Sequence, residues 1–379
     1  MFPLLHVYCV LSFASAFDFT PVDEAVEAAL KRGDCPGAVV IVLHKDQVVL
    51  RKAYGHRSIE PEKSPMTADA IFDLASLTKP IATATSIMLL IEQGKLHTDD
   101  KVAKHWPAFA ANGKGDVSIA QLLLHTSGLT ADNAIADYAD GRAKALERIA
   151  ALKLEVPPGT RFKYSDVGFI VLGELVEKIS GLPIDRFAKK NIFEPLKMTD
   201  SGFNPPEELR QRIAPTGQRE GRTILGEVHD PRSFKMGGVA GHAGLFASGD
   251  DLARYCRMIL RKGELDGTRI LKPETIKLFT EAHDIPAGGK PGTSPRKLFR
   301  SYGWDVDTAY SGQRGDGFRR GEGFGHTGFT GTSIWIDPQT QTAIIILTNR
   351  VHPADKGNVS RLRREIATAA AKIIGASVK

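Results

Sequence analysis

Three short motifs stand far apart in this chain, and a fold that uses them together must bring its middle and its C-terminal part to one place. Residues 76–79 (S-L-T-K) head an apolar run, residues 164–166 (Y-S-D) follow in mid-chain, and residues 326–328 (H-T-G) precede an apolar segment. A serine hydroxyl is a poor nucleophile at neutral pH unless a neighbouring group takes its proton. Lys79, three residues after Ser76, lies on the same face of a helix. The pair predicts serine acyl-transfer chemistry.

The apolar run after the first motif predicts a buried helix with Ser76 as its N-cap. Residues 81–91 are apolar on most sides, and the Gln-Gly pair at 93–94 supplies a C-terminal stop. Pro80 lacks an N–H, which a helix tolerates best in its first turn. The helix N-terminus would stabilise an oxyanion, with the backbone N–H of Ser76 as one donor. Taken alone, S-x-x-K is weak, since an N-cap serine with a solvated lysine is the simpler interpretation.

With the three motifs in this order, the chain resembles the serine β-lactamase and penicillin-binding-protein superfamily. The resemblance is to its class C-like branch of esterases, D-aminopeptidases and amidases. It extends to the segments 94–96, 123–129, 157–160, 228–230, 237–246 and 347–353. The segments 228–230 and 347–353 resemble the subgroup found with muramic-acid recycling, which includes N-acetylmuramyl-alanine amidases. The resemblance implies an antiparallel sheet flanked by N- and C-terminal helices, a large α-helical lobe, and an active site between them.

Hydrophobic periodicity by itself indicates a mixed α/β (α+β) chain. Paired apolar runs predict two hairpins, and helical periodicity predicts four clear helices. The hairpins combine residues 38–43 with 48–53 and residues 332–336 with 343–348, and the helices cover 21–32, 167–179, 250–261 and 359–374. We expect one domain over residues 17–379. Its sheet lobe comprises about 17–70 and 284–379, and its helical lobe about 71–283.

The first sixteen residues predict a signal peptide. Residues 1–16 carry no Lys, Arg, Asp or Glu, run mostly apolar, and end in Ala-Ser-Ala. A basic n-region is missing, which leaves a mis-assigned start codon or a buried N-terminal segment as alternatives. No other run approaches the ~18 apolar residues of a membrane span. We therefore expect a secreted or periplasmic protein without a membrane span.

Composition and motif context argue against other classes of function. The net charge is +6, but the basic residues are scattered and no nucleic-acid motif accompanies them. Residues 323–328 spell the dinucleotide fingerprint G-x-G-x-x-G, yet a loop precedes them and a strand follows, which is the wrong context. No metal-ligand spacing occurs and the three cysteines predict no disulfide framework. We expect no cofactor and no metal, and the oligomeric state is left open.

The predicted mechanism is a double displacement. Ser76 attacks a carbonyl after losing its proton to Lys79 or Tyr164, and water then hydrolyses the acyl-enzyme. Lys79 serves as the base only when uncharged, which requires burial and nearby positive charge to lower its pKa. The sequence does not choose between the two bases. Gly328 allows close backbone approach, and the N–H of Phe329 is the expected second oxyanion donor.

Two positions depart from the β-lactamase pattern. Where many relatives carry Asn, Asp166 brings a carboxylate that pairs with Lys79 or receives a substrate N–H. Where β-lactamases carry the K-T-G lysine, His326 is neutral or fractionally charged near pH 7 and attracts a substrate carboxylate less strongly. Both differences argue against efficient β-lactam hydrolysis. We expect a small-molecule or muropeptide substrate, either a small ester or a peptidoglycan-derived amide. The alternatives are a β-lactamase or DD-peptidase, and a non-enzymatic penicillin sensor that is acylated without turnover.

Five further polar side chains have two interpretations each. His125, in a turn, is predicted to be a structural hydrogen-bonding residue. His229, Asp230 and His242 either line the substrate pocket or stabilise a loop. Arg350 either clamps a substrate carboxylate or forms a surface ion pair, and the ion pair is favoured.

Overall fold

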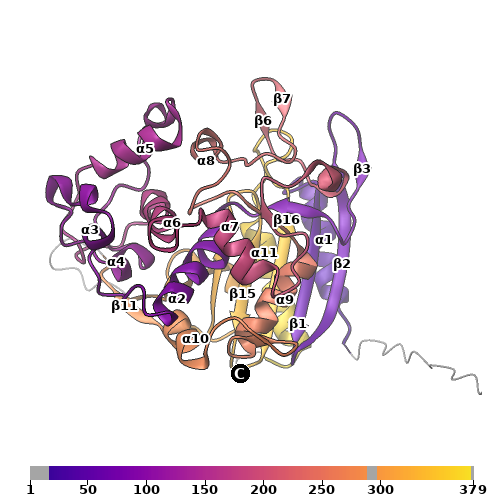
Figure 1. Ribbon diagram of the computed structural model, residues 1–379. Helices are drawn as coiled ribbons and strands as arrows, with labels where there is room; N and C mark the ends of the chain where they lie inside the picture. The colour runs from indigo at the N-terminus through magenta and orange to yellow at the C-terminus, as the bar shows by residue number, and fades with distance from the viewer. Residues whose placement is uncertain (1–16, 288–296, 377–379) are drawn as a thin grey trace, which may run out of the picture.

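The centre of the molecule is a nine-stranded antiparallel sheet in the order β11-β12-β13-β14-β15-β16-β1-β2-β3. The computed structural model describes residues 17–287 and 297–376, so the predicted signal peptide at 1–16 lies outside the described residues. The strands are β11 (His283–Ile285), β12 (Leu298–Arg300), β13 (Asp305–Asp307), β14 (Phe324–Thr327), β15 (Ser333–Asp337), β16 (Thr342–Thr348), β1 (Gly37–His44), β2 (Gln47–Ser58) and β3 (Ser64–Pro65). The indigo strand β1 pairs with the yellow strand β16 in Figure 1, which joins the two ends of the chain.

Helices from both ends of the chain cover one face of this sheet. Helix α1 (Thr20–Arg32) packs beside α11 (Ser360–Ile373), as Figure 1 shows. Because side chains alternate along a strand, Val40 and Val42 of β1 join this helix-covered core, whereas Ile41 joins the larger core on the opposite face. The central strand is therefore buried on both sides.

The middle of the chain forms a helical region next to the other face of the sheet; Figure 1 shows α3 to α6 on the left and α9 beside β1. Its helices are α2 (Thr85–Glu92), α3 (Val102–His105), α4 (Ile119–Leu123), α5 (Gly141–Ala150), α6 (Asp166–Ser180), α7 (Ile184–Ala188), α8 (Pro231–Lys235), α9 (Gly249–Leu260) and α10 (Pro273–Thr280). A three-stranded sheet combines β4 (Ile71–Asp73), β8 (Leu245–Ser248) and β5 (Gly202–Phe203), and two short hairpins pair β6 (Gln218–Arg219) with β7 (Arg222–Thr223) and β9 (Glu264–Leu265) with β10 (Thr268–Arg269).

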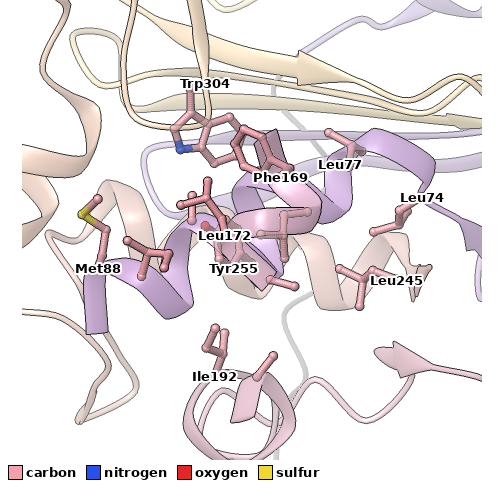
Figure 2. Packing of buried hydrophobic residues seen from close by; sticks show 14 of the residues in the cluster. Leu74, Leu77, Met88, Phe169, Leu172, Ile192, Leu245, Tyr255 and Trp304 are labelled. Carbon is pink, nitrogen blue, oxygen red and sulfur yellow. The ribbon is translucent and has the colours of Figure 1, made fainter. Parts of the chain in front are cut away.

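A single apolar cluster connects this helical region to the sheet. Figure 2 shows Met88 of α2, Phe169 of α6 and Trp304 of the sheet region packed together. Each of these side chains is fully buried, and burying one such side chain contributes roughly 1.5–3 kcal/mol. The elements that carry the first two motifs are thus fixed against each other. No helix within the described ranges is both long and apolar enough to span a bilayer.

The predicted fold class is confirmed, and so are both hairpins and the four helices, whose ends differ from prediction by about one residue at most. The predicted start of the helix at Ser76 is wrong. The chain passes through a 3₁₀ turn, η1 (Ala75–Leu77), and a wide π-type turn, η2 (Lys79–Ala84), before regular α-helix begins at Thr85. Pro80 lacks an N–H and its ring clashes with the carbonyl four residues earlier, so a regular helix forms only after it.

Candidate active site

A tight turn after strand β4 presents Ser76. Ala75, just before the serine, has φ 47°, a left-handed conformation that non-glycine residues adopt at a cost of ~1 kcal/mol or more. Buried Asp73 holds this turn: Oδ1 accepts a hydrogen bond from the Ala75 N–H at 2.8 Å, and Oδ2 accepts one from the His229 N–H at 2.6 Å. Burial raises the pKa of Asp73 to about 6. The nucleophile therefore stands on a backbone turn that other segments lock in place.

Lys79 is fully buried beneath the serine. Its Nζ donates to Ser76 Oγ at 3.0 Å and to the His242 carbonyl at 3.0 Å, and lies 2.6 Å from Asp166 Oδ1 in an ion pair. Burial disfavours the charged amine, but the negative charge of Asp166, aided by Tyr164, outweighs it and raises the pKa of Lys79 above its usual value. The uncharged lysine that the role of base requires is thus disfavoured. Of the two predicted partners of Asp166, the structure shows Lys79.

Tyr164 reaches the same cluster from the start of helix α6. The next residue, Ser165, is the N-cap: its Oγ accepts the Gly168 N–H at 3.1 Å. The Tyr164 hydroxyl hydrogen-bonds with Lys79 and Ser76, and its ring stacks on His125 at 4.4 Å between centroids. Burial raises the pKa of Tyr164 even though the neighbouring Lys79 favours the phenolate. Ser165, the central residue of the Y-S-D motif, is therefore a helix cap that orients Tyr164 and Asp166.

The third motif ends strand β14 beside Tyr164. The His326 ring is buried and lies 5.9 Å from the Tyr164 ring between centroids. Its Nδ1 lies 2.9 Å from the Thr327 carbonyl oxygen, which only accepts, so Nδ1 carries the proton. Burial lowers the pKa of His326 well below 6.5, and the charges of Arg300 and Lys79 lower it further. His326 is neutral near pH 7, in line with the first of the two predicted states.

The H-T-G turn packs directly on the residues that precede Ser76. A Cβ on Gly328 would stand 2.4 Å from the Leu74 carbonyl oxygen and 2.2 Å from Thr332 Oγ1, so only glycine fits there. Thr332 Oγ1 in turn donates to the Leu74 carbonyl at 3.0 Å. This contact keeps the backbone around Phe329 close to the nucleophile turn. The role of Ser76 and Phe329 as the two oxyanion donors stays a prediction.

These residues face a cavity of about 440 Å³. Its lining includes five of the seven predicted site residues: Ser76, Tyr164, His326, Gly328 and Phe329. The other two, Lys79 and Asp166, are not part of this lining; Lys79 contacts Ser76, and Asp166 pairs with Lys79. In the described ranges, no group of three His, Cys, Asp or Glu side chains is arranged to hold a metal ion.

Sequence reasoning missed several residues that line or support the cavity. Arg300 and Gln313 are buried in its wall. Arg363 of α11 supports the H-T-G turn, donating to the carbonyls of Gly328 at 3.0 Å and Thr332 at 2.7 Å. None belongs to a catalytic motif: Arg300 ends a short apolar pair, Gln313 lies in a 3₁₀ turn, and Arg363 lies between two other arginines of a helix. Arg300 directly follows the apolar pair 298–299, and a charge at the end of so short an apolar run is too common a pattern to mark it.

The five ambiguous side chains have structural partners. His125 Nδ1 accepts the Ser165 N–H at 3.0 Å, as a structural residue would. Asp230 caps helix α8 and lies 2.9 Å from His242 Nε2, and together they stabilise a loop. The His229 ring stacks on Phe329, the most exposed aromatic of the cavity wall. Arg350 pairs with Asp355 at 2.9 Å while also lining the cavity.

Comparisons with known proteins identify the family of the chain. The Beta-lactamase family model matches residues 22–368. The chain is 32% identical over 353 residues to an Escherichia coli K12 protein named "Putative D-alanyl-D-alanine carboxypeptidase", covering 84% of this chain and 79% of that protein. It is 31% identical over 367 residues to an N-acetylmuramyl-L-alanine amidase of Bacillus subtilis, covering 87% and 80%.

The fold matches solved structures as well. A penicillin-binding-protein homologue from Caulobacter crescentus superposes with a TM-score of 0.74 at 23% identity, covering 93% of this chain and 97% of that chain. The chain belongs to the Beta-lactamase family and is a serine hydrolase of that family.

Proposed function

We propose that this protein cleaves an amide or ester through a Ser76 acyl-enzyme, acting on peptidoglycan-derived amides or small esters. The observation that carries the proposal is the 3.0 Å contact between Lys79 Nζ and Ser76 Oγ, at the wall of a 440 Å³ cavity. The names of the two relatives support an amide next to an alanine as the bond cleaved. Export, suggested by residues 1–16, is part of the same proposal.

The raised pKa of Lys79 favours Tyr164 as the group that moves the proton. Ser76 Oγ forms a bond to the substrate carbonyl carbon while its proton passes to the Tyr164 oxygen. The Tyr164 proton passes to the leaving nitrogen or oxygen, so no net charge is left on the tyrosine. Water then attacks the acyl carbon and passes a proton to the Tyr164 oxygen. The Tyr164 proton passes to Ser76 Oγ as the bond between Ser76 and the acyl group breaks. Throughout, charged Lys79 holds Ser76 and stabilises negative charge as it develops on the relay.

The oxyanion forms where two backbone N–H groups converge in this proposal, those of Ser76 and Phe329. Removing one such donor typically costs roughly 100- to 1,000-fold in kcat. The close approach of Gly328 to the Leu74 carbonyl supports this pairing, since it ties the two turns together. Any side chain at position 328 would push them apart.

A second candidate function is DD-carboxypeptidase activity. The E. coli relative's name favours it, and the same acyl-enzyme chemistry serves both reactions. A β-lactamase is less favoured, because neutral His326 stands where β-lactamases carry a lysine.

The test is hydrolysis by the purified full-length protein of four substrates. They are a short-chain p-nitrophenyl ester, a chromogenic cephalosporin, an N-acetylmuramyl-L-alanine amide and a peptide ending in D-Ala-D-Ala. We expect turnover of the ester and of at least one amide, and loss of turnover and of fluorophosphonate labelling in Ser76→Ala. Ser86→Ala, which changes a buried serine of α2, is the matched control and should keep both. Turnover that survives Ser76→Ala would reject the serine as nucleophile.

A further inference from the structure

The guanidinium of Arg300 is buried at the cavity wall, and two of its three nitrogens have no partner among the described residues. The side chain is 0% exposed, and its Nη1 donates to Asp305 Oδ1 at 3.1 Å. Its Nε and Nη2 have no hydrogen-bond partner in the described chain. A buried donor left unpaired is costly to a folded protein, and such groups are rare in native structures. This edge of Arg300 therefore needs an acceptor that the described residues do not supply.

The two unused nitrogens are the ones that a carboxylate would use. Nε and Nη2 point from the same edge of the planar guanidinium, and this edge forms two parallel hydrogen bonds with the two oxygens of a carboxylate. Arg300 lines the same cavity as Ser76 and Tyr164. A carboxylate bound there would belong to a molecule that also reaches the nucleophile.

The internal partner of Arg300 is not free to fill that edge. Asp305 faces Arg300 across the β12–β13 pairing. Its two carboxylate oxygens also accept hydrogen bonds from the hydroxyls of Thr308 and Ser311. Because its oxygens accept three hydrogen bonds, Asp305 neutralises the charge of Arg300 without reaching Nε and Nη2.

A second buried side chain in the same wall is also unpartnered. Gln313 is 3% exposed, lines the cavity, and has no partner in the described chain for either Oε1 or Nε2. A side-chain amide offers one acceptor and two donors. It is complementary to another amide, such as a peptide bond or an N-acetyl group.

Other charged groups around the cavity already have partners. Lys79 is paired with Asp166, and His326 is neutral. Arg350 pairs with Asp355, and Nη2 of Arg363 holds two backbone carbonyls. Within the described wall of the cavity, Arg300 is the fully buried cation, and both nitrogens of its bidentate edge are unpartnered.

We propose that Arg300 binds a carboxylate of the substrate through Nε and Nη2, next to an amide held by Gln313. The substrate class is then an N-acylated amino acid or short peptide with a free carboxylate. His326 stands where β-lactamases carry the K-T-G lysine, and it attracts a carboxylate only weakly. Arg300, on strand β12, supplies the positive charge instead. This inference rests on the proposed function and specifies its substrate.

The test compares two matched pairs of ester substrates with the full-length protein. One pair consists of phenyl esters of N-acetylglycine with a meta carboxylate or a meta carboxamide on the ring. The other pair consists of p-nitrophenyl succinate and p-nitrophenyl succinamate. In one pair or both, we expect kcat/KM to favour the carboxylate by about 10- to 100-fold, the range of charge-assisted hydrogen bonds.

Three variants identify the group responsible for the preference. Arg300→Gln should bring the carboxylate-to-carboxamide ratio close to one, mainly through KM. Asp305→Asn keeps the arginine but removes the neutralising charge, so the ratio should rise by about threefold or more. Arg350→Gln, the matched arginine at the cavity, should leave the ratio as in the wild type.

Several results would overturn the inference. They are a wild-type ratio of one in both pairs, a ratio that Arg300→Gln leaves intact, or a ratio removed by Arg350→Gln instead. If Arg300→Gln does not fold, Asp305→Asn still tests the inference. A carboxylate-to-carboxamide ratio that Asp305→Asn leaves unchanged would reject the role of Arg300. Failure to hydrolyse any of the esters or amides would reject the proposed function itself, whereas ester hydrolysis with a ratio of one rejects only the role of Arg300.

Discussion

Two buried ion pairs lie at this cavity, and they differ in how completely the cation is used. In the closed pair, Lys79 contacts Asp166 at 2.6 Å and donates to Ser76 Oγ and to the His242 carbonyl. In the open pair, Arg300 donates to Asp305 and leaves Nε and Nη2 without a partner in the described chain. A cation whose donors all have partners fixes a geometry, whereas a cation with unpaired donors can still bind a ligand.

The difference assigns the two pairs to different parts of catalysis. The closed pair joins turn η2 to helix α6, far apart in sequence, and positions the nucleophile. The open pair joins the neighbouring strands β12 and β13 and faces the space for substrate. Changes in the closed pair should lower the rate for every substrate alike. Changes in the open pair should alter the choice among substrates.

The largest expected effect comes from Tyr164, the relay group beside the closed pair. Tyr164→Phe removes the hydroxyl that passes the proton, so kcat should fall about 100- to 10,000-fold. The factor should be the same for carboxylate and carboxamide esters. Tyr310→Phe is the control, because Tyr310 also lines the cavity, with its ring 5.5 Å from that of Tyr164 between centroids. An unchanged rate in Tyr164→Phe would remove the tyrosine from the mechanism.

A smaller effect tests the protonation state of the closed pair. Asp166→Asn removes the carboxylate that raises the pKa of Lys79, leaving burial, which lowers it. If charged Lys79 is the active form, activity is lost as pH rises through this pKa, so the basic limb of kcat/KM against pH should move to lower pH.

The opposite result would show that neutral Lys79 is the base. In that case the acidic limb of the profile would move down and activity at pH 7 would rise in Asp166→Asn. Asp132→Asn is the matched control, because Asp132 lies near Asp166 but pairs with Arg232. It should leave both limbs close to their wild-type positions.

The smallest effect concerns His326, whose pKa is lowered by burial and by the positive charges of Arg300 and Lys79. The unfolded chain takes up a proton near pH 6.5, whereas the folded chain does not until well below that pH. Stability is therefore lost as pH falls below 6.5, by up to about 1.4 kcal/mol per pH unit from this residue. His326→Gln should make urea unfolding less sensitive to pH between 6.5 and 5. An equal slope in wild type and variant would contradict the buried neutral state.

The parts of the fold that could be predicted are those with local periodicity. Strand β1 and its hairpin partner β2 followed from two apolar runs around a polar turn, and helix α11 from an apolar stripe. The three motifs were likewise local strings, and the fold brings Ser76, Tyr164 and His326 to one cavity.

The parts that could not be predicted depend on contacts between distant segments. Asp73 locks the nucleophile turn by accepting the N–H of His229, a residue 156 positions away. The helix start at Ser76 was wrong because this tertiary lock, together with Pro80, overrides the capping preference of a serine. Arg300 could not be recognised because an unused donor edge is a property of packing and leaves no pattern in the sequence.

The most direct test of the central claim is to trap the acyl-enzyme. The protein would be mixed with a slowly hydrolysed ester or amide, quenched with acid within the turnover time, digested, and its peptides weighed by mass spectrometry. We predict the mass of the acyl group on the peptide that contains Ser76, and none in Ser76→Ala. A substrate that is turned over without any adduct at Ser76, or with the adduct on another residue, would contradict the account.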